Sequence, residues 1–381
     1  MTSPSWSLSC SACDTAVPVV RASLCPQCGQ PLYARYAPVV AGTALAPRWD
    51  QWRYAPFMPL LTGEVPVSLG EGLTPLIESR ALAEAVGVRR LWIKDEGQNP
   101  TASFKARGMS AAVTRARGEG YPGLAVPTAG NAGAAIAAYG AAAGMPVRVY
   151  APRTTPRPIL DTIEAMGATL VRIDGHIGDA GKLTMAFAAE SGFFNVATLR
   201  EPYRVEGMKT MGFELAEQLG WRLPDVVVYP TGGGEGTVGI HKAIGELMTG
   251  GWLPSESRMP QFVIAQAAGC APIARAHAAG AERAEPWVDP VTYASGLRVP
   301  SPLGDRLLLR LLRETRGVAG TASEELIREW TARLAHATGV DAAPEGGCAL
   351  SVLRDAVVAG TVAREAEVVV FNTGAGASYR S

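Results

Sequence analysis

The sequence predicts an α/β fold in which parallel sheets are covered by helices on both faces, preceded by a small N-terminal unit. Three observations support this prediction. Apolar runs alternate with helical segments between residues 91 and 253, glycine-rich turns follow several of these runs, and two Cys-x-x-Cys pairs precede them all. Because 381 residues exceed the usual size of a single core, two larger domains are expected beside the N-terminal unit.

The composition is that of a globular protein with a large core, with 48% hydrophobic and 18% charged residues. Lys plus Arg and Asp plus Glu each number 35, so no general positive charge favours nucleic acid or an anionic membrane surface. The first eight residues lack the basic start and apolar centre of a signal peptide, and no apolar run is long enough to cross a bilayer. We therefore expect a cytoplasmic protein without nucleic-acid or membrane partners.

The N-terminal unit, residues 1–36, holds four of the six cysteines in two pairs. This spacing is typical of a zinc ribbon, in which four thiolates bind the metal tetrahedrally, with a small hairpin through residues 17–20 between the pairs. Four free thiols in a disordered tail are the alternative. So short a segment has almost no apolar core, so metal binding would supply most of its folding free energy. The predicted zinc ligands are Cys10, Cys13, Cys25 and Cys28.

Residues 37–70 are rich in proline, tryptophan and arginine, as in the run RWDQWRY. Such a run can stack on nucleic acid, but its prolines and the helical pattern that follows favour an arm packed on the larger body. A helix is expected over residues 79–86, where alanines and leucines follow a helical period.

From residue 91 onward, unbroken Val/Ile/Leu runs alternate with helices, the pattern of parallel strands buried on both faces. Ligands bind such sheets beyond the C-terminal ends of the strands, and the glycine-rich motifs of this chain follow strand ends. The predicted strands cover residues 91–94, 124–127, 147–151, 169–173, 226–230, 262–266 and 368–371, with helices between them and over 303–313, 323–338 and 344–359.

The stretch NPTASFKARG ends the first of these strands and opens an alanine-rich helix. Its threonine and serine are helix-capping types, which places Lys105 in the first helical turn, where the helix dipole disfavours a protonated amine. The neighbouring cation Arg107 and partial burial beside Phe104 would further favour a neutral, nucleophilic amine. Lys105 is therefore the candidate for Schiff-base chemistry, with a solvated surface lysine as the alternative.

The loop TGGGEGT, residues 231–237, follows a buried strand and opens a helix. Its backbone amides can therefore converge on a phosphate, with the helix dipole behind them. The glycines also match a dinucleotide fingerprint, but they come too late for a first βαβ unit and lack a strand-end acid at the expected distance. A purely structural turn is the other alternative.

The turn TAGNAG begins at Thr128 and places Asn131 at the start of a helix of small residues. An amide side chain there can hold a ligand oxygen, and free backbone donors can take a carboxylate. An ordinary N-cap asparagine is the alternative.

Taken together, the motifs NPTxSFK, AGNAG, TGGGxG and a C-terminal NTGxG resemble the fold-type II enzymes that use pyridoxal 5′-phosphate (PLP). The cysteine pairs, GEGLTPL, RVEGMKTMGFEL, GCAP and PEGG are similar to the threonine synthase group of this family. The likeness covers nearly the whole chain, and the order of the motifs is more specific than any one of them.

The resemblance implies two doubly wound parallel-sheet domains after the zinc-ribbon-like segment: a large PLP domain of residues 37–105 and 207–381, and a small α/β domain of residues 106–206. It implies a carbon–oxygen lyase, a homodimer, that converts O-phospho-L-homoserine and water to L-threonine and phosphate. The alternative within the fold is β-replacement or elimination on another activated amino acid, such as phosphoserine, serine or threonine. A zinc-ribbon binding module with an inactive large domain is a rival that the intact lysine and the lack of basic patches disfavour.

Carried onto this chain, the resemblance makes Lys105 the lysine that bonds to PLP and later shuttles protons. Asn131 would bind the 3′ oxygen of PLP, and Thr373 would face the pyridine nitrogen. A neutral hydroxyl there makes the cofactor a moderate electron sink, suited to elimination and replacement. The implied cofactor contacts are Lys105, Phe104, Asn131, Gly232, Gly233, Gly234, Glu235, Gly236 and Thr373, and the implied substrate contacts are Ser103, Arg107, Thr128, Ala129, Gly130 and Lys182.

Three positions depart from the family pattern. Ala106 stands where an Asp often follows the lysine, and Ala268 stands where the family often has Glu. Glu235 is unexpected, because a carboxylate beside a phosphate dianion is repulsive unless its side chain points away or meets a cation. These departures bear on the substrate more than on the cofactor.

Overall fold

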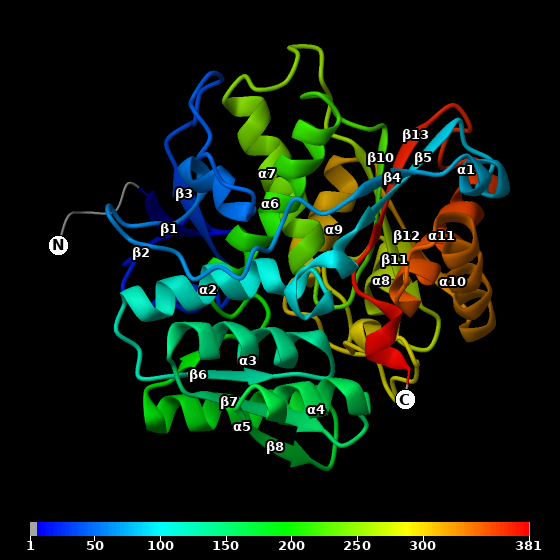
Figure 1. Ribbon diagram of the computed structural model, residues 1–381. Coiled ribbons are helices and arrows are strands. Elements are labelled where there is room, and N and C mark those ends of the chain that lie inside the picture. Colours follow the sequence, from blue (N-terminus) through cyan, green and yellow to red (C-terminus); the bar gives the residue numbers. More distant parts are fainter. Residues whose placement is uncertain (1–5, 381) are drawn as a thin grey trace.

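The computed structural model describes residues 6–380, whose strands form three sheets (Figure 1). The smallest sheet lies near the N-terminus and is antiparallel, in the order β2-β1-β3. The predicted hairpin through residues 17–20 is wrong: β2 ends at Val17 and pairs with β1, so the hairpin turns between Cys10 and Ala16, and a third strand follows the second cysteine pair. The strands are β1 (Trp6–Cys10), β2 (Ala16–Val17) and β3 (Leu32–Tyr36).

The largest sheet has the strand order β12-β11-β10-β13-β5-β4 and is parallel except where β4 pairs with β5. In β10, Val226 and Val228 belong to the core on one face, and Val227 and Tyr229 to the core on the other. Successive strand residues point to opposite faces, so the unbroken apolar run reflects a strand covered on both sides. The strands are β4 (Leu76–Glu78), β5 (Arg90–Asp95), β10 (Val226–Pro230), β11 (Gln261–Ala267), β12 (Val318–Ala322) and β13 (Glu367–Asn372).

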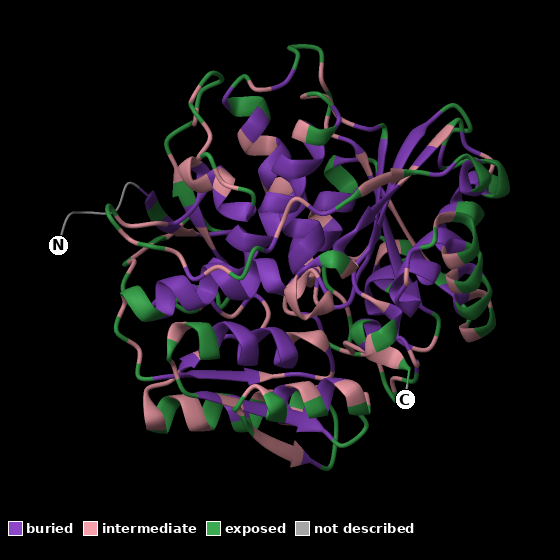
Figure 2. Ribbon diagram, viewed as in Figure 1, coloured by how far each residue is buried: buried purple, intermediate pink, exposed green. Residues whose placement is uncertain are grey.

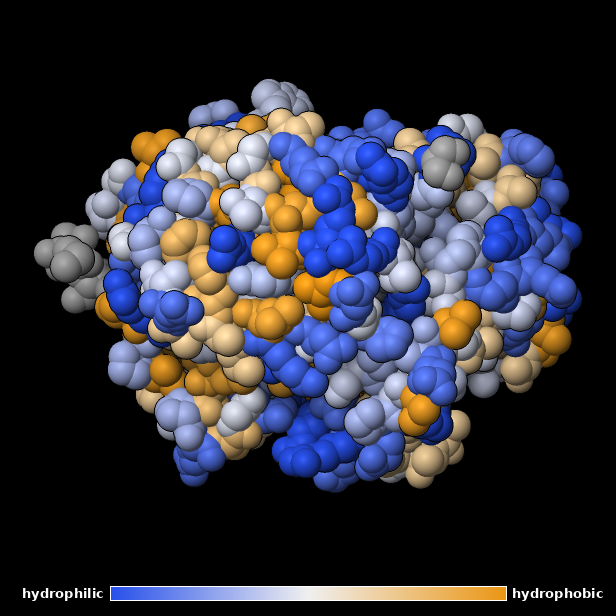
Figure 3. Space-filling view, turned by 90° about the horizontal axis from the view of Figure 1, so that it is seen from below, coloured by the Kyte–Doolittle hydropathy of each residue, from blue (hydrophilic) through white to orange (hydrophobic). Residues whose placement is uncertain are grey.

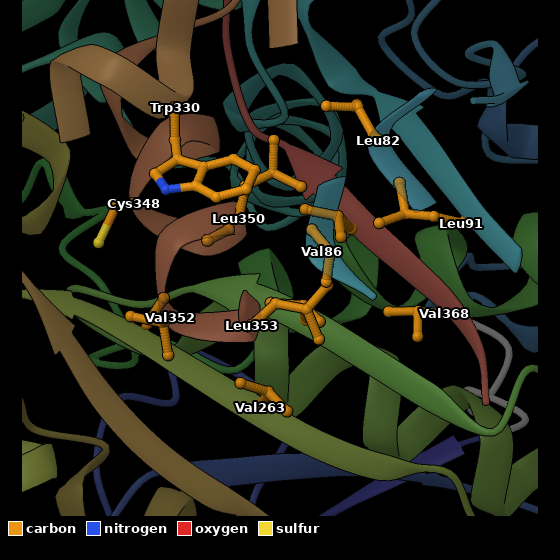
Figure 4. Close-up of a cluster of buried hydrophobic side chains, with 14 of the residues drawn as sticks. Leu82, Val86, Leu91, Val263, Trp330, Cys348, Leu350, Val352, Leu353 and Val368 are labelled. Carbon is orange, nitrogen blue, oxygen red and sulfur yellow. The ribbon is translucent and has the colours of Figure 1, made fainter. Parts of the chain in front are cut away.

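Two groups of helices cover this sheet. The first is α1 (Arg80–Val86), α10 (Glu324–Thr338) and α11 (Pro344–Val358). Figure 4 shows Leu350 and Leu353 of α11 packed between the sheet residues Val263 and Val368 and Trp330 of α10. The second group, on the other face, is α6 (Tyr203–Gln218), α7 (Glu235–Thr249), α8 (Pro272–Ala278) and α9 (Asp305–Glu314).

The third sheet is parallel, in the order β8-β7-β6-β9, and lies at the bottom of Figure 1. Helix α5 covers one face, and α3 and α4 cover the other. Helix α2 packs on both α3 and α6, so it joins this unit to the larger one. The elements are β6 (Leu124–Pro127), β7 (Val147–Pro152), β8 (Thr169–Ile173), β9 (Phe194–Asn195), α2 (Lys105–Gly118), α3 (Asn131–Ala143), α4 (Arg157–Ala165) and α5 (Ile177–Ser191).

The segment of residues 37–70 packs on the larger body, as predicted. Its helical turn η1 (Gln51–Phe57) buries Trp52, whose indole N–H donates to Ser110 of α2 over 2.9 Å. This ring is therefore not free to stack on a nucleic-acid base, although Trp49 is 90% exposed. The packed-arm interpretation is confirmed for the part of the segment that carries η1.

Burial follows the layers: the larger sheet and the helices α2, α6 and α7 are mostly buried, whereas α10 exposes its outer face (Figure 2). Seen from below, hydrophobic residues form separate patches between hydrophilic ones (Figure 3). Every helix within residues 6–380 is too short or too polar to span a lipid bilayer.

Candidate active site

A cavity of about 60 Å³ lies where the loops after β5, β10 and β13 meet the start of α3. A second and larger cavity, of about 390 Å³, lies between β3, α7 and α9. None of the predicted active-site residues lines this larger cavity. The smaller cavity instead joins motifs that are far apart in the sequence. Its lining includes Phe104, Lys105, Asn131, the loop from Thr231 to Gly236, Glu345, Thr373 and Tyr379.

Lys105 is the first residue of α2, as the sequence predicts. The predicted helix caps are wrong: Phe104 occupies the N-cap position, and Thr101 donates its hydroxyl to the Pro100 carbonyl. The Ser103 hydroxyl is buried and has no hydrogen-bond partner among the described residues. The predicted contact with Phe104 is confirmed, because Lys105 Nζ lies 4.2 Å from the centre of that ring.

The charges around Lys105 differ from those predicted. Burial lowers the pKa of Lys105, while the neighbouring Glu235 carboxylate raises it and the Arg204 guanidinium lowers it. The nearby cation is therefore Arg204 of α6, not Arg107. The two cations share one partner, because Glu235 Oε1 accepts hydrogen bonds from Lys105 Nζ over 2.7 Å and from Arg204 Nη2.

Arg107 lies away from the cavity, in a buried cluster between η2 (Glu96–Gln98) and α6. Its guanidinium pairs with Glu96 over 2.6 Å and with Glu214 over 2.9 Å. A substrate contact by Arg107 is therefore wrong, because a fully buried cation with two carboxylate partners cannot also reach the cavity. Lys182 does not line the cavity either, because its side chain is 78% exposed on α5 and pairs with Asp179.

The glycine-rich loop after β10 forms a tight cradle at the start of α7. Gly234 has φ +91°, and a Cβ there would lie 2.7 Å from Leu308. A Cβ on Gly236 would lie 2.2 Å from the Tyr229 hydroxyl oxygen. Glycine therefore lets the backbone pass closely, and the free amides of the α7 N-terminus can bind an anion.

The turn after β6 is held from within. Thr128 Oγ1 donates to the Gly130 carbonyl over 2.6 Å and accepts from the Gly130 and Gly133 amides, each over 3.1 Å. This hydroxyl shapes the turn, so a direct substrate contact through the Thr128 side chain is not supported. Asn131 is the first residue of α3 and faces the cavity. Ala129 lines a separate small cavity between Pro152 and Pro290.

The lining of the cavity contains two residues that sequence reasoning missed as site residues. Tyr379, in the C-terminal turn η5 (Gly376–Tyr379), donates its hydroxyl to Glu345 Oε1 over 2.8 Å. Burial raises the pKa of Glu345, whose Oε1 also accepts from the Gly296 amide. The PEGG motif pointed to Glu345 only as part of the resemblance, and no motif marks Tyr379.

The four N-terminal cysteines converge, as predicted. Their ligand atoms all lie within 4.8 Å of one another. The Cys10–Cys28, Cys13–Cys28 and Cys13–Cys25 sulfur pairs are 3.4, 3.5 and 3.7 Å apart. Four sulfurs at about 2.3 Å from one zinc ion would be about 3.8 Å apart at tetrahedral corners. The cluster therefore fits a tetrahedral metal.

The cavity also fits PLP. A partly buried lysine amine and the glycine cradle line the same cavity, and Asn131 and Thr373 complete the walls. Two buried carboxylate oxygens at the wall, Glu235 Oε2 and Glu345 Oε2, lack a hydrogen-bond partner among residues 6–380, as do Ser103 Oγ and Ser295 Oγ, which are next in the chain to the lining residues Phe104 and Gly296. Unpaired buried polar groups are costly unless a ligand satisfies them. Fold and site together define the class of PLP-dependent enzymes.

The chain belongs to this class, because residues 67–374 match the family described as "Pyridoxal-phosphate dependent enzyme". It is 35% identical over 326 residues to threonine synthase of Methanosarcina acetivorans. The matched region covers 85% of this chain and 78% of that protein. It is 32% identical over 324 residues to threonine synthase of Mycobacterium leprae, covering 85% and 86%.

Solved structures show the same fold. Maize serine racemase has a TM-score of 0.68 at 21% identity, covering 79% of this chain and 88% of that chain. The threonine deaminase from T.th. has a TM-score of 0.63 at 25% identity, covering 79% and 92%. The prediction of a fold-type II α/β architecture is confirmed.

Proposed function

We propose that this protein is a PLP-dependent threonine synthase that converts O-phospho-L-homoserine and water to L-threonine and phosphate. The observation that carries the proposal is that Lys105 and the glycine cradle line one cavity, in a chain whose threonine synthase relatives match over 85% of its length. The intact lysine and cradle argue against an inactive large domain.

In this proposal, Lys105 bonds to PLP and the 232–236 amides bind the cofactor phosphate. Asn131 binds the 3′ oxygen and Thr373 faces the pyridine nitrogen. When bound, PLP withdraws electrons from the substrate α-carbon and so makes its proton acidic. Thr373 offers a neutral hydroxyl, which leaves that withdrawal moderate.

The residues of the chain then bind the substrate and move protons. The Thr128–Asn131 turn before α3 offers its free amides to the substrate carboxylate. The amine of Lys105 takes protons from Cα and Cβ in turn, which allows phosphate to leave from Cγ. Protons then return to Cγ and Cα, and the hydroxyl of a water molecule adds at Cβ. Of the cationic residues predicted to bind the cofactor or the substrate, Lys105, Arg107 and Lys182, only Lys105 lines the cavity.

The test is incubation of the PLP-loaded protein with O-phospho-L-homoserine, with phosphate and threonine measured separately. We expect equal amounts of the two products. Release of phosphate without threonine would overturn the proposed reaction.

A second candidate is β-replacement or elimination on another activated amino acid, such as phosphoserine, serine or threonine. The observation that favours it is the buried Glu235 carboxylate beside Lys105, which opposes a dianionic leaving group. Turnover of these amino acids without turnover of O-phospho-L-homoserine would select the second candidate.

We also propose that the cysteine cluster binds one structural zinc ion. The sulfur separations support this proposal, and the short N-terminal sheet has few other sources of stability. The homodimer and the domain boundaries at residues 36, 105 and 206 remain predictions of the resemblance, and the cytoplasmic location remains a prediction from the N-terminal sequence and the lack of a long apolar run. Light scattering, limited proteolysis and fractionation test them.

A further inference from the structure

The Lys105 amine contacts a carboxylate that the phosphate loop does not need. Glu235 is the first residue of α7 and only 2% exposed, and its Oε1 lies 2.7 Å from Lys105 Nζ. A carboxylate here opposes the binding of an anion at the same helix terminus. A role in anion binding therefore does not explain this residue, and its contact with the amine is its main feature.

Glu235 is fixed in place by Arg204. The guanidinium is 1% exposed, donates Nη1 to the Val196 carbonyl over 2.7 Å and donates Nη2 to Glu235 Oε1. Because burial and the Val196 carbonyl hold Arg204 in place, the carboxylate that it binds has little freedom to move. The carboxylate that accepts from the Lys105 amine is thus positioned by Arg204 of α6. The flexibility of the Glu235 side chain does not decide where its carboxylate lies.

We propose that Glu235, oriented by Arg204, is a positioning residue that holds the Lys105 amine and stabilises its protonated form in the cofactor-free protein. The proposal rests on the assignment of Lys105 as the PLP lysine. It gives a reason for the departure from the family pattern at position 235, since the carboxylate acts on the lysine and not on the phosphate.

The other titratable groups near the amine act differently. Burial and Arg204 both disfavour the charged amine, and Glu235 alone favours it. Glu201, at the start of α6, accepts from the Tyr203 and Arg204 amides, and burial raises its pKa to about 7. Elsewhere in the lining of the cavity, the Tyr379 hydroxyl donates a hydrogen bond to the Glu345 carboxylate.

The test measures how fast the cofactor-free protein takes up PLP as the pH is varied. Bond formation requires the neutral amine: its nitrogen adds to the PLP aldehyde carbon, and one water leaves. Removing the carboxylate lowers the pKa of the amine, so Glu235→Gln should shift the midpoint of the uptake rate to lower pH by about one unit or more. Glu246→Gln, on the same helix but in a pair with Lys209 and Lys242, is the matched control and should leave the midpoint unchanged.

A second variant covers the case in which Glu235→Gln leaves Arg204 unpaired and the protein fails to fold. The double variant Glu235→Gln/Arg204→Gln removes both charges, and its midpoint should shift in the same direction by less, because Glu235 acts on Lys105 more strongly than Arg204 does. Unchanged midpoints in a folded variant would overturn the proposal while leaving the PLP function intact. If the wild type takes up no PLP at any pH, the assignment of Lys105 as the PLP lysine is wrong, and the proposal for Glu235 falls with it.

Discussion

The guanidinium of Arg107 donates to Glu214 of α6 over 2.9 Å, and both side chains are fully buried. Glu96 is its second carboxylate partner, and Lys94 also pairs with Glu214. These two cations and two anions form a cluster at the base of the loop that leads to Lys105. They therefore stabilise the site without contacting the substrate.

Removing one member should therefore destabilise the fold. Arg107→Met leaves two buried carboxylates with one cation, which we expect to lower the free energy of unfolding by about 3–5 kcal/mol. Lys182→Ala, which breaks an exposed pair, should change it by less than about 1 kcal/mol. Denaturant unfolding measures both, and similar losses in the two variants would contradict the role of the cluster.

The same cluster predicts a loss of stability in acid. Burial alone would raise the pKa of Glu214, but Arg107 and Lys94 lower it to about 2. A carboxyl group with a lowered pKa stabilises the fold above its unfolded value of about 4.3, and that contribution disappears as the pH falls towards about 2. Unfolding free energies across this range should fall steeply in the wild type and less steeply in Arg107→Met. Equal slopes would contradict the pairing.

The glycine cradle predicts that alanine substitutions at two glycines of α7 have different effects on stability and PLP binding. Gly236→Ala places a Cβ within 2.2 Å of the Tyr229 hydroxyl oxygen, so we expect a loss of about 1–3 kcal/mol in stability and weaker PLP binding. Gly245→Ala, later in α7, has no atom within 4 Å of its Cβ and should be neutral or slightly stabilising. Thermal unfolding and PLP titration test this, and equal effects would show that the cradle is not tight.

The cysteine cluster predicts about one zinc ion per chain. Cys25→Ser should lose the metal and lower the unfolding temperature of the N-terminal sheet, because metal binding stabilises so small a unit. Cys270→Ser, a buried thiol outside the cluster, should retain the zinc. Elemental analysis of the two variants decides, and a metal-free wild type of unchanged stability would contradict the site.

The sequence predicted the seven main strands and the order of the helices well, because buried parallel strands are unbroken apolar runs. It missed β4, β9 and β12, which are short or lie at a sheet edge and lack such runs. Local motifs located Lys105 and the glycine cradle, since each depends on neighbours in the chain. Arg204 and Tyr379 were missed and Arg107 was misplaced, because which cation turns towards a cavity depends on contacts between segments far apart in the sequence.

The most direct test of the central assignment is borohydride reduction of the PLP-loaded protein, followed by mass spectrometry of its peptides. Lys105 should carry the reduced cofactor, and Lys105→Ala should lose both the label and the visible absorption that borohydride removes. Cofactor bound at another lysine, or a protein that binds no PLP, would contradict the account.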